Sequence, residues 1–186
     1  MIRTFIAIAL PADIRGLITR FQETARSAGG DVKWVRPESL HITLKFLGDV
    51  PEERIETVCE AVRLSATGIP PFSISVEGAG AFPNEKRPRV LWVGISEGRD
   101  RLIDLAGRLE TEMAKIGFEK EERAYSAHLT MGRVRSSAGI GAVIERMRTA
   151  GFAGGRFEAG EVRVMKSDLE KSGAVYTALG TIKLQR

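Results

Sequence analysis

The sequence contains few of the residues that mark whole classes of protein. Its 186 residues include a single cysteine, Cys59, so no disulfide can form within the chain. No apolar run approaches the roughly 18 residues that a membrane-spanning helix needs. The apolar stretch after Met1 is interrupted by Pro11 too soon to be a signal peptide. These absences argue against a disulfide-stapled secreted protein and a membrane protein, and we expect a cytoplasmic protein.

The motifs of several large enzyme classes are missing as well. The chain has no HExxH zinc motif, no GxxxxGK[ST] phosphate-binding loop and no GxSxG nucleophile motif. A zinc site needs three or four ligands, whereas this chain has two histidines that lie 87 residues apart. We therefore expect no metal or nucleotide cofactor, and a chemistry carried by side chains alone.

The composition is that of a globular protein with a mild basic excess. Apolar residues make up 43% of the chain and charged residues 28%, with both signs mixed, which is not the pattern of disorder. The net charge is +4 and the sequence pI is about 9.5. This charge is compatible with an anionic ligand and equally with a merely solvated basic surface. The length suits one domain with a proper core.

Strand and helix patterns alternate along the chain. We expect Cys59 on the apolar side of a helix that follows Pro51. Apolar positions recur at helical spacing in the other expected helices, at 12–28, 99–117 and 140–150. Alternating or β-branched runs predict strands at 3–10, 31–36, 41–46, 72–78, 89–95, 126–134, 156–165 and 174–184.

The two histidines stand in matching segments. Residues 36–44, RPESLHITL, align without a gap with residues 123–131, RAYSAHLTM, and share Arg, Ser, His and Thr at an offset of 87. The flanking helices sit at nearly the same displacement. We interpret this as a diverged internal duplication: a single domain, 1–186, built of two β-α-β-α-β halves at about 1–85 and 86–186.

The repeated pattern, His-apolar-Thr-apolar, predicts a specific chemistry. On a strand, His41 and Thr43 point to one face, about 6–7 Å apart, and His128 and Thr130 do the same. Two such strands across a groove would present two imidazoles and two hydroxyls. One imidazole can accept a proton from water while the other donates one to a leaving oxygen, and the hydroxyls can bind phosphate oxygens. The pattern therefore favours phosphoryl chemistry.

The two motifs, together with VKWVRPESLHITLKFLGDV (32–50) and HLTMGRV (128–134), carry a family resemblance. The chain resembles the two-histidine (2H) phosphoesterase superfamily, and within it the RNA 2′,3′-cyclic phosphodiesterases, also called 2′-5′ RNA ligases. The resemblance implies an α+β fold of the LigT-like kind. In it, two pseudo-twofold antiparallel sheets carry helices on the outside and enclose a central cleft.

The resemblance also implies a reaction and its residues. The enzyme would hydrolyse a terminal 2′,3′-cyclic phosphate on RNA, tRNA fragments included, to a 2′-phosphomonoester, without metal. We expect a monomer, because the chain already contains both halves of its site. His41 would be the proton donor and His128 the proton acceptor, with Thr43 and Thr130 on the phosphate. The joining of 2′-5′ ends is the reverse reaction in this family. Ala127 departs from the proline usual before the second histidine and removes no catalytic group.

Five further residues are candidates for substrate binding. Arg133 matches a phosphate-binding arginine of the family, although strict alternation from His128 turns it to the opposite face unless the strand bulges near Gly132. For Phe46 we favour core packing over base stacking. Alternation places Lys45 on the His41 face, either on RNA phosphates or in solvent. Base stacking by Trp34 and Phe82 competes with packing in the cleft wall, which we favour.

Two alternative functions remain at this point. One is phosphodiesterase action on another substrate, such as a 2′-5′ oligonucleotide or a cyclic nucleotide. The other is a nucleotide- or RNA-binding module without catalysis. Two complete motifs argue against the second alternative, because a binding module needs no pair of proton-transfer groups.

Overall fold

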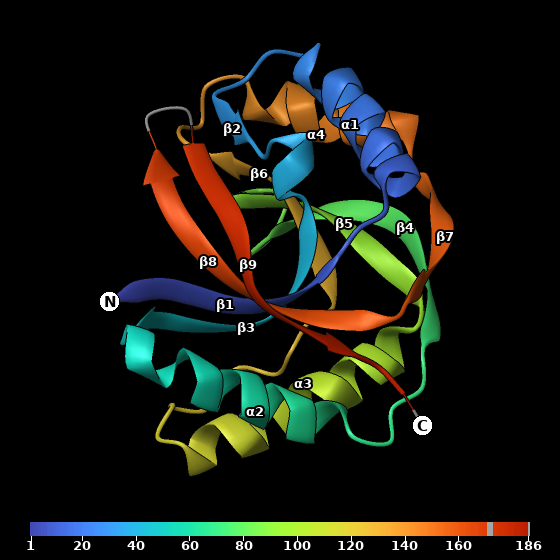
Figure 1. Cartoon of the computed structure of the whole chain (residues 1–186). Coiled ribbons are helices and arrows are strands. Elements are labelled where there is room, and N and C mark those ends of the chain that lie inside the picture. The colour runs from blue at the N-terminus through green and yellow to red at the C-terminus, as the bar shows by residue number, and fades with distance from the viewer. Residues whose placement is uncertain (171–172, 186) are drawn as a thin grey trace.

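The computed structural model describes residues 1–170 and 173–185, which form two antiparallel sheets and four α-helices (Figure 1). The first sheet has the strand order β3-β1-β8-β9 and the second the order β2-β6-β5-β4-β7. The elements in chain order are β1 (Ile2–Ala9), α1 (Ala12–Arg26), β2 (Val32–Trp34), β3 (His41–Val50), α2 (Ile55–Ala66), β4 (Phe72–Phe82), β5 (Val90–Glu97), α3 (Arg99–Lys115), β6 (His128–Val134), α4 (Ile140–Ala150), β7 (Ala153–Ala159), β8 (Glu161–Glu170) and β9 (Gly173–Lys183).

The expected α+β arrangement of two antiparallel sheets is confirmed, but the sheets do not coincide with the two sequence halves. Strand β4, which ends the first half, pairs with β5 in the second sheet. Strand β8, from the second half, pairs with β1 in the first sheet. The first half therefore contributes β2 and β4 to the second sheet, and the second half contributes β8 and β9 to the first. Neither sheet is complete within about 1–85 or 86–186.

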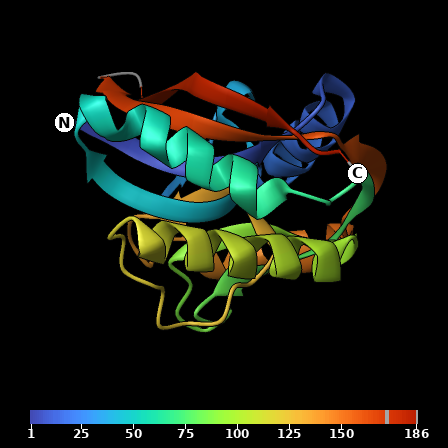
Figure 2. The same cartoon turned by 60° about the horizontal axis from the view of Figure 1, so that its bottom comes forward.

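The helices cover the two sheets in pairs. Helix α2 packs against α3 and against β8 and β9, while α1 packs against α4 and β7. Figure 1 places α2 and α3 together at the bottom and α1 and α4 together at the top. Figure 2 shows α2 and α3 alongside each other. Each helix buries its expected apolar stripe, because one face at helical spacing meets a sheet or another helix; examples are Ile14, Ile18, Val58, Val62, Leu102, Leu105 and Val143.

Strand β1 lies at the centre of the first sheet, between β3 and β8. Its residues Phe5, Ile6, Ala7 and Ile8 are all buried, so it lacks the polar alternation of a half-exposed strand. Cys59 is half-buried on α2 as expected, with its sulfur close to Gly180 of β9, and burial raises the pKa of its thiol.

One expected strand is two strands in the structure. The run 156–165 is divided at Gly160, where the chain leaves the second sheet as β7 and enters the first sheet as β8. An apolar and β-branched pattern does not reveal this change of sheet, because both strands continue the same local periodicity. The other boundaries move by a few residues; β4, for instance, continues past Gly78 to Phe82.

Over the described residues, no helix is both long and apolar enough to cross a bilayer.

Candidate active site

The two histidine strands lie beside each other, one from each sheet. His41 begins β3 at the edge of the first sheet, and His128 begins β6 in the second sheet, between β2 and β5. Strands β3 and β6 are in contact. Just before β6, the Tyr125 hydroxyl donates a hydrogen bond to the Thr43 carbonyl, at 3.0 Å. The fold therefore brings together two motifs that are 87 residues apart in the sequence.

Each histidine is held by the same local hydrogen bond. His41 Nδ1 lies 2.8 Å from the Ser39 carbonyl oxygen, and His128 Nδ1 lies 2.7 Å from the Ser126 carbonyl oxygen. A carbonyl oxygen can only accept, so each Nδ1 carries the hydrogen. Nε2 is then the atom that titrates and exchanges protons with a substrate. The shared serines of the repeat mark these positions, although their backbone rather than their hydroxyls holds the rings.

Burial shapes the acidity of both rings. Desolvation lowers the pKa of His41, and the hydrogen bond to Ser39 opposes this shift. Desolvation likewise lowers the pKa of His128; the bond to Ser126 opposes this, and the positive charge of Arg133 lowers the pKa further. In the free protein, each imidazole therefore becomes protonated only at a pH lower than the ordinary histidine pKa of 6.5.

The bulge expected near Gly132 is present and reorients Arg133. Strand β6 has one extra residue, Met131, opposite the step from Leu91 to Trp92 in β5. An extra residue shifts the alternation of side chains by one position. Arg133, exposed at the end of the strand, thereby returns to the face of His128. Its charge lowers the pKa of His128 and also that of Tyr176, whose ring lies beside His41.

A matching bulge in β3 corrects two of the sequence-based interpretations. Leu44 is an extra residue opposite the step from Ile6 to Ala7 in β1, at the same offset of 87 from Met131. The alternation shifts here too, so Lys45 turns to the buried side. Phe46 turns to the His41 face instead of into the core.

Lys45 does not lie on the His41 face of β3. The expectation that it contacts RNA phosphates or extends into solvent is therefore wrong. The residue is 4% exposed, and its ammonium donates to both carboxylate oxygens of Glu110, at 2.8 and 2.7 Å. It also donates to the Glu119 carbonyl, at 2.9 Å. The bulge at Leu44 is the reason, because strict alternation would have put Lys45 beside His41.

Phe46 is 57% exposed, so the interpretation as a core residue was wrong. Its ring centroid is 6.0 Å from that of Phe5, which lies 4.8 Å from the His41 ring. The side chain borders a groove of about 670 Å³ formed by residues 46–48 and 117–123. Phe46 is thus an open aromatic surface beside the His41 end of the site.

Trp34 lies on the opposite side of the second sheet from Arg133. In the β2–β6 pair, Lys33 is opposite Arg133 and Trp34 is opposite Gly132. The half-buried Trp34 ring packs close to Gly132 and against the hydrophobic core. The side chain is therefore a packing residue, as we favour, but it packs on the face of the sheet opposite to Arg133 and not in the cleft wall.

Aromatic rings surround both histidines. The Tyr176 ring lies edge-on to His41, with 5.2 Å between centroids, and Phe82 lies edge-on to His128, at 4.9 Å. Phe82 also packs against Trp92, at 5.3 Å. Sequence reasoning missed Tyr176, because its place depends on the pairing of β9 in the first sheet and no local pattern marks it.

The described residues include no group of three or more His, Cys, Asp or Glu side chains that could hold a metal ion. The strands β3 and β6, which are in contact, carry two imidazoles with Nδ1 engaged, and Thr43, Thr130 and the guanidinium of Arg133 lie on the same strand faces as these rings. This set can move two protons and bind an anion.

Comparisons with known proteins agree with this geometry. The sequence profile of the LigT like phosphoesterase family matches the chain twice, over residues 8–92 and 93–176. The RNA 2′,3′-cyclic phosphodiesterase of Methanothermobacter thermautotrophicus is 38% identical over 184 residues, which are 98% of this chain and 99% of that protein. The protein of the same name from Escherichia coli is 35% identical over 140 residues, 73% and 74% of the two chains.

Solved structures show the same fold. A crystal structure of a protein from Thermus thermophilus superimposes with a TM-score of 0.80 at 27% identity and covers 98% of this chain and 97% of that one. Escherichia coli LigT complexed with 3′-AMP has a TM-score of 0.79 at 26% identity and covers 100% and 99%. On the two profile matches and the full-length relatives, this chain belongs to the LigT like phosphoesterase family.

Proposed function

We propose that this protein hydrolyses the terminal 2′,3′-cyclic phosphate of RNA to a 2′-phosphomonoester, by acid-base catalysis between two histidines. One observation carries the proposal: two imidazoles on β3 and β6, which are strands of different sheets in contact, each with Nδ1 bound to the carbonyl of the serine two residues before it. The names of the full-length relatives, RNA 2′,3′-cyclic phosphodiesterase, support the choice of substrate.

In the proposed reaction, the oxygen of a water molecule attacks phosphorus and the bond from phosphorus to O3′ breaks. His128 Nε2 accepts a proton from the water, and His41 Nε2 donates a proton to O3′. These two proton transfers open the cyclic ester to a 2′-phosphate. A proton then passes from His128 to His41 through solvent, which restores the starting protonation state of both imidazoles. If the 5′-hydroxyl of a second RNA strand attacks phosphorus in place of water, the same proton transfers break the bond to O3′ and leave a 2′-5′ linkage.

Binding of the phosphate falls to the side chains on the same faces. We assign Thr43, Thr130 and Arg133 to the non-bridging oxygens, where negative charge increases in the transition state. Phe46 and Phe82 are the proposed stacking surfaces for bases, one beside each histidine. Lys45 and Trp34 have no place in this set, because both turn away from the catalytic faces.

The proposed setting is a monomer in the cytoplasm that acts on RNA ends such as those of tRNA fragments. The chain supplies both histidine strands, so one copy contains the whole proposed site. Sedimentation velocity tests the monomer, because a second copy would double the mass of 20.3 kDa.

The central test uses a dinucleotide with a 2′,3′-cyclic phosphate end in excess EDTA. We expect turnover in EDTA, and a fall of roughly 10² to 10⁴ in kcat for both His41→Ala and His128→Ala with unchanged circular dichroism. The exposed Lys33, opposite Arg133 in the β2–β6 pair, gives the control variant Lys33→Ala, which should keep its rate.

The product identifies which oxygen leaves. Phosphorus NMR should show a 2′-phosphate, since His41 protonates O3′ in the proposed arrangement. Loss of activity in EDTA, full activity of either alanine variant, or a 3′-phosphate product would each contradict the proposed mechanism.

A further inference from the structure

Lys45 is a buried cation that the proposed reaction does not use. Its side chain is 2% exposed and leaves β3 on the face opposite His41 and Thr43. The ammonium group has three donors, and the structure gives it three acceptors: the two carboxylate oxygens of Glu110 on α3 and the carbonyl of Glu119. Lys45 thus joins the strand of the first histidine to the segment that leads to the second.

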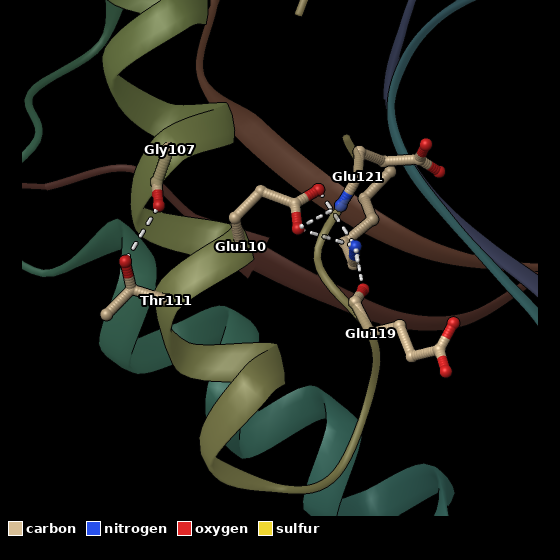
Figure 3. Close-up of polar contacts among 6 residues, drawn as sticks. Gly107, Glu110, Thr111, Glu119 and Glu121 are labelled. Carbon is tan, nitrogen blue, oxygen red and sulfur yellow. Dashed lines mark hydrogen bonds and ion pairs between the residues drawn. The ribbon is translucent and has the colours of Figure 1, made fainter. Parts of the chain in front are cut away.

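The same ion pair holds that segment at a second point. Glu110 Oε2 also accepts a hydrogen bond from the backbone N–H of Glu121, at 3.2 Å. Figure 3 shows Glu110 reaching from α3 to the strip of chain that carries Glu119 and Glu121. We use the name Lys45 clasp for Lys45, Glu110 and the backbone groups of Glu119 and Glu121.

The clasp holds a stretch that has little structure of its own. Residues 119–127 belong to no helix or strand in the described chain and lead directly into β6 at His128. Upstream, Arg54 donates to the Ile116 carbonyl and its guanidinium carbon lies 5.1 Å from the Phe118 ring centroid. Downstream, Tyr125 donates to the Thr43 carbonyl. Two of these attachments, those of the clasp and of Tyr125, run to β3 itself.

The ion pair is better suited to setting geometry than to adding stability. Desolvation of two charges offsets much of their attraction, so apolar residues of similar volume often replace a buried pair without loss of stability. Apolar side chains fill the same space but cannot bind the Glu119 carbonyl or the Glu121 amide. A change to such residues should therefore release the segment while the core stays packed.

We propose that the Lys45 clasp is a positioning device for the reaction: it fixes residues 119–127 against β3, so that His128 faces His41 across the phosphate. This inference rests on the proposed function, which requires both imidazoles at one phosphorus atom. Lys45 and Glu110 are positioning residues and touch no substrate. A displacement of about 1 Å at a catalytic group can lower the rate by about 10². We expect release of the segment to lower the rate by up to this factor.

The test replaces the pair by apolar residues and compares it with a matched pair on the same helix. The variant Lys45→Met/Glu110→Leu should unfold cooperatively near the wild-type temperature, with kcat lowered roughly 10- to 100-fold and KM changed by less than about threefold. The control is Lys115→Met/Glu112→Leu, which removes a Lys–Glu contact of the same 2.7 Å within α3, where Lys115 is 64% exposed and Glu112, like Glu110, is half-buried. It should keep the wild-type kcat.

Two further measurements separate positioning from structure. Hydrogen exchange at the amides of residues 117–127 should quicken in the clasp variant and not in the control. The pKa of His128, followed by NMR, should move toward 6.5 as its surroundings loosen, while the pKa of His41 stays closer to its wild-type value. If the apolar variant does not fold, Glu110→Gln tests the positioning role instead. Its amide oxygen still accepts a hydrogen bond, while the negative charge beside Lys45 is removed. We expect for it the same changes at smaller size.

The outcomes distinguish this inference from the proposed function. Wild-type protein that fails to open a cyclic phosphate contradicts the proposed function, and the exchange measurement then still shows whether the clasp holds the segment. The positioning role would be overturned if the wild-type protein is active and the clasp variants have the same kcat, the same amide exchange rates and the same His128 pKa as the wild type.

Discussion

At the scale of single residues, the pair of lowered histidine pKa values sets the pH dependence. Catalysis needs one protonated and one neutral imidazole, so kcat/KM is highest between the two pKa values of the free protein. Burial lowers both below 6.5, and above both values the proton donor is lost as pH rises. We therefore expect kcat/KM to peak below about pH 6.5 and to fall across neutrality.

The bound state should behave differently. A phosphodiester anion beside His41 favours its protonated form and raises its pKa, so the kcat profile should extend to higher pH than that of kcat/KM. Steady-state rates across the pH range, in buffers of constant ionic strength, measure both profiles. A kcat/KM optimum at or above about pH 7 would contradict the pair of lowered pKa values.

Arg133 gives a second prediction at this scale, because it acts on both substrate and acid-base pair. Removal of its charge in Arg133→Gln should raise the pKa of His128, since the cation lowers it. The loss of a charged hydrogen bond to phosphate should also lower kcat/KM by roughly 10- to 100-fold. NMR titration of His128 and steady-state kinetics check the two effects.

The neighbouring exposed lysine provides the comparison for Arg133. Lys33 stands opposite Arg133 on β2 and shares its face of the sheet. Lys33→Gln removes the same charge from that face and should leave kcat/KM within about twofold, because it lies on an outer strand beyond β6. Equal losses in the two variants would indicate a general charge effect instead of a specific contact.

At the scale of secondary structure elements, Gly80 on β4 leaves space for the Trp92 ring, which supports Phe82 beside His128. A Cβ on Gly80 would lie 2.5 and 2.8 Å from two atoms of the Trp92 indole. That rigid ring packs on Phe82, which lies edge-on to His128. Gly80→Ala should therefore destabilise the protein by about 1–3 kcal/mol and lower kcat.

The control for this change is a glycine with free space. Gly107, exposed on α3, has nothing within 4 Å of an added Cβ, so Gly107→Ala should stabilise the protein by about 0.5–1 kcal/mol. Thermal and denaturant unfolding measure both variants. A Gly80→Ala protein as stable and as active as the wild type would show that the Trp92 ring does not rest on Gly80.

Two matched bulges are the features of these elements that most affect the site. The repeat HITL and HLTM predicts alternation, and His41, Thr43, His128 and Thr130 follow it. Beyond each threonine, the extra residue reverses the pattern. Which residue bulges depends on how β3 pairs with β1 and β6 with β5, and the sequence of one strand does not contain that register.

At the scale of the whole molecule, the exchange of strands makes the two halves dependent on each other. Sheet order β3-β1-β8-β9 needs strands from both ends of the chain, and β4 needs β5 and β7. We expect the full chain to unfold in one transition, with equal calorimetric and van't Hoff enthalpies, as a single domain does. Differential scanning calorimetry measures both.

Fragments test the same dependence directly. The separate pieces 1–85 and 86–186 should lack cooperative unfolding, because each leaves a central strand without its neighbour. Coexpression of the two pieces should restore the fold and the activity. An isolated piece with a sharp unfolding transition would show that a half is an independent domain.

The family resemblance of the sequence implied the class of fold. The sequence alone determined the helices with their buried stripes, the repeat at an offset of 87 residues and the four residues of the His-apolar-Thr-apolar motifs. These depend on local periodicity and on a pattern repeated at a fixed offset, both of which are written in the chain. The tertiary structure decided the rest: the buried Lys45, the exposed Phe46, the return of Arg133, the place of Tyr176 and the exchange of β4 and β8. The physical reason is that each of these depends on cross-strand register and on which strands become neighbours, and only packing of the whole chain selects between the possible pairings.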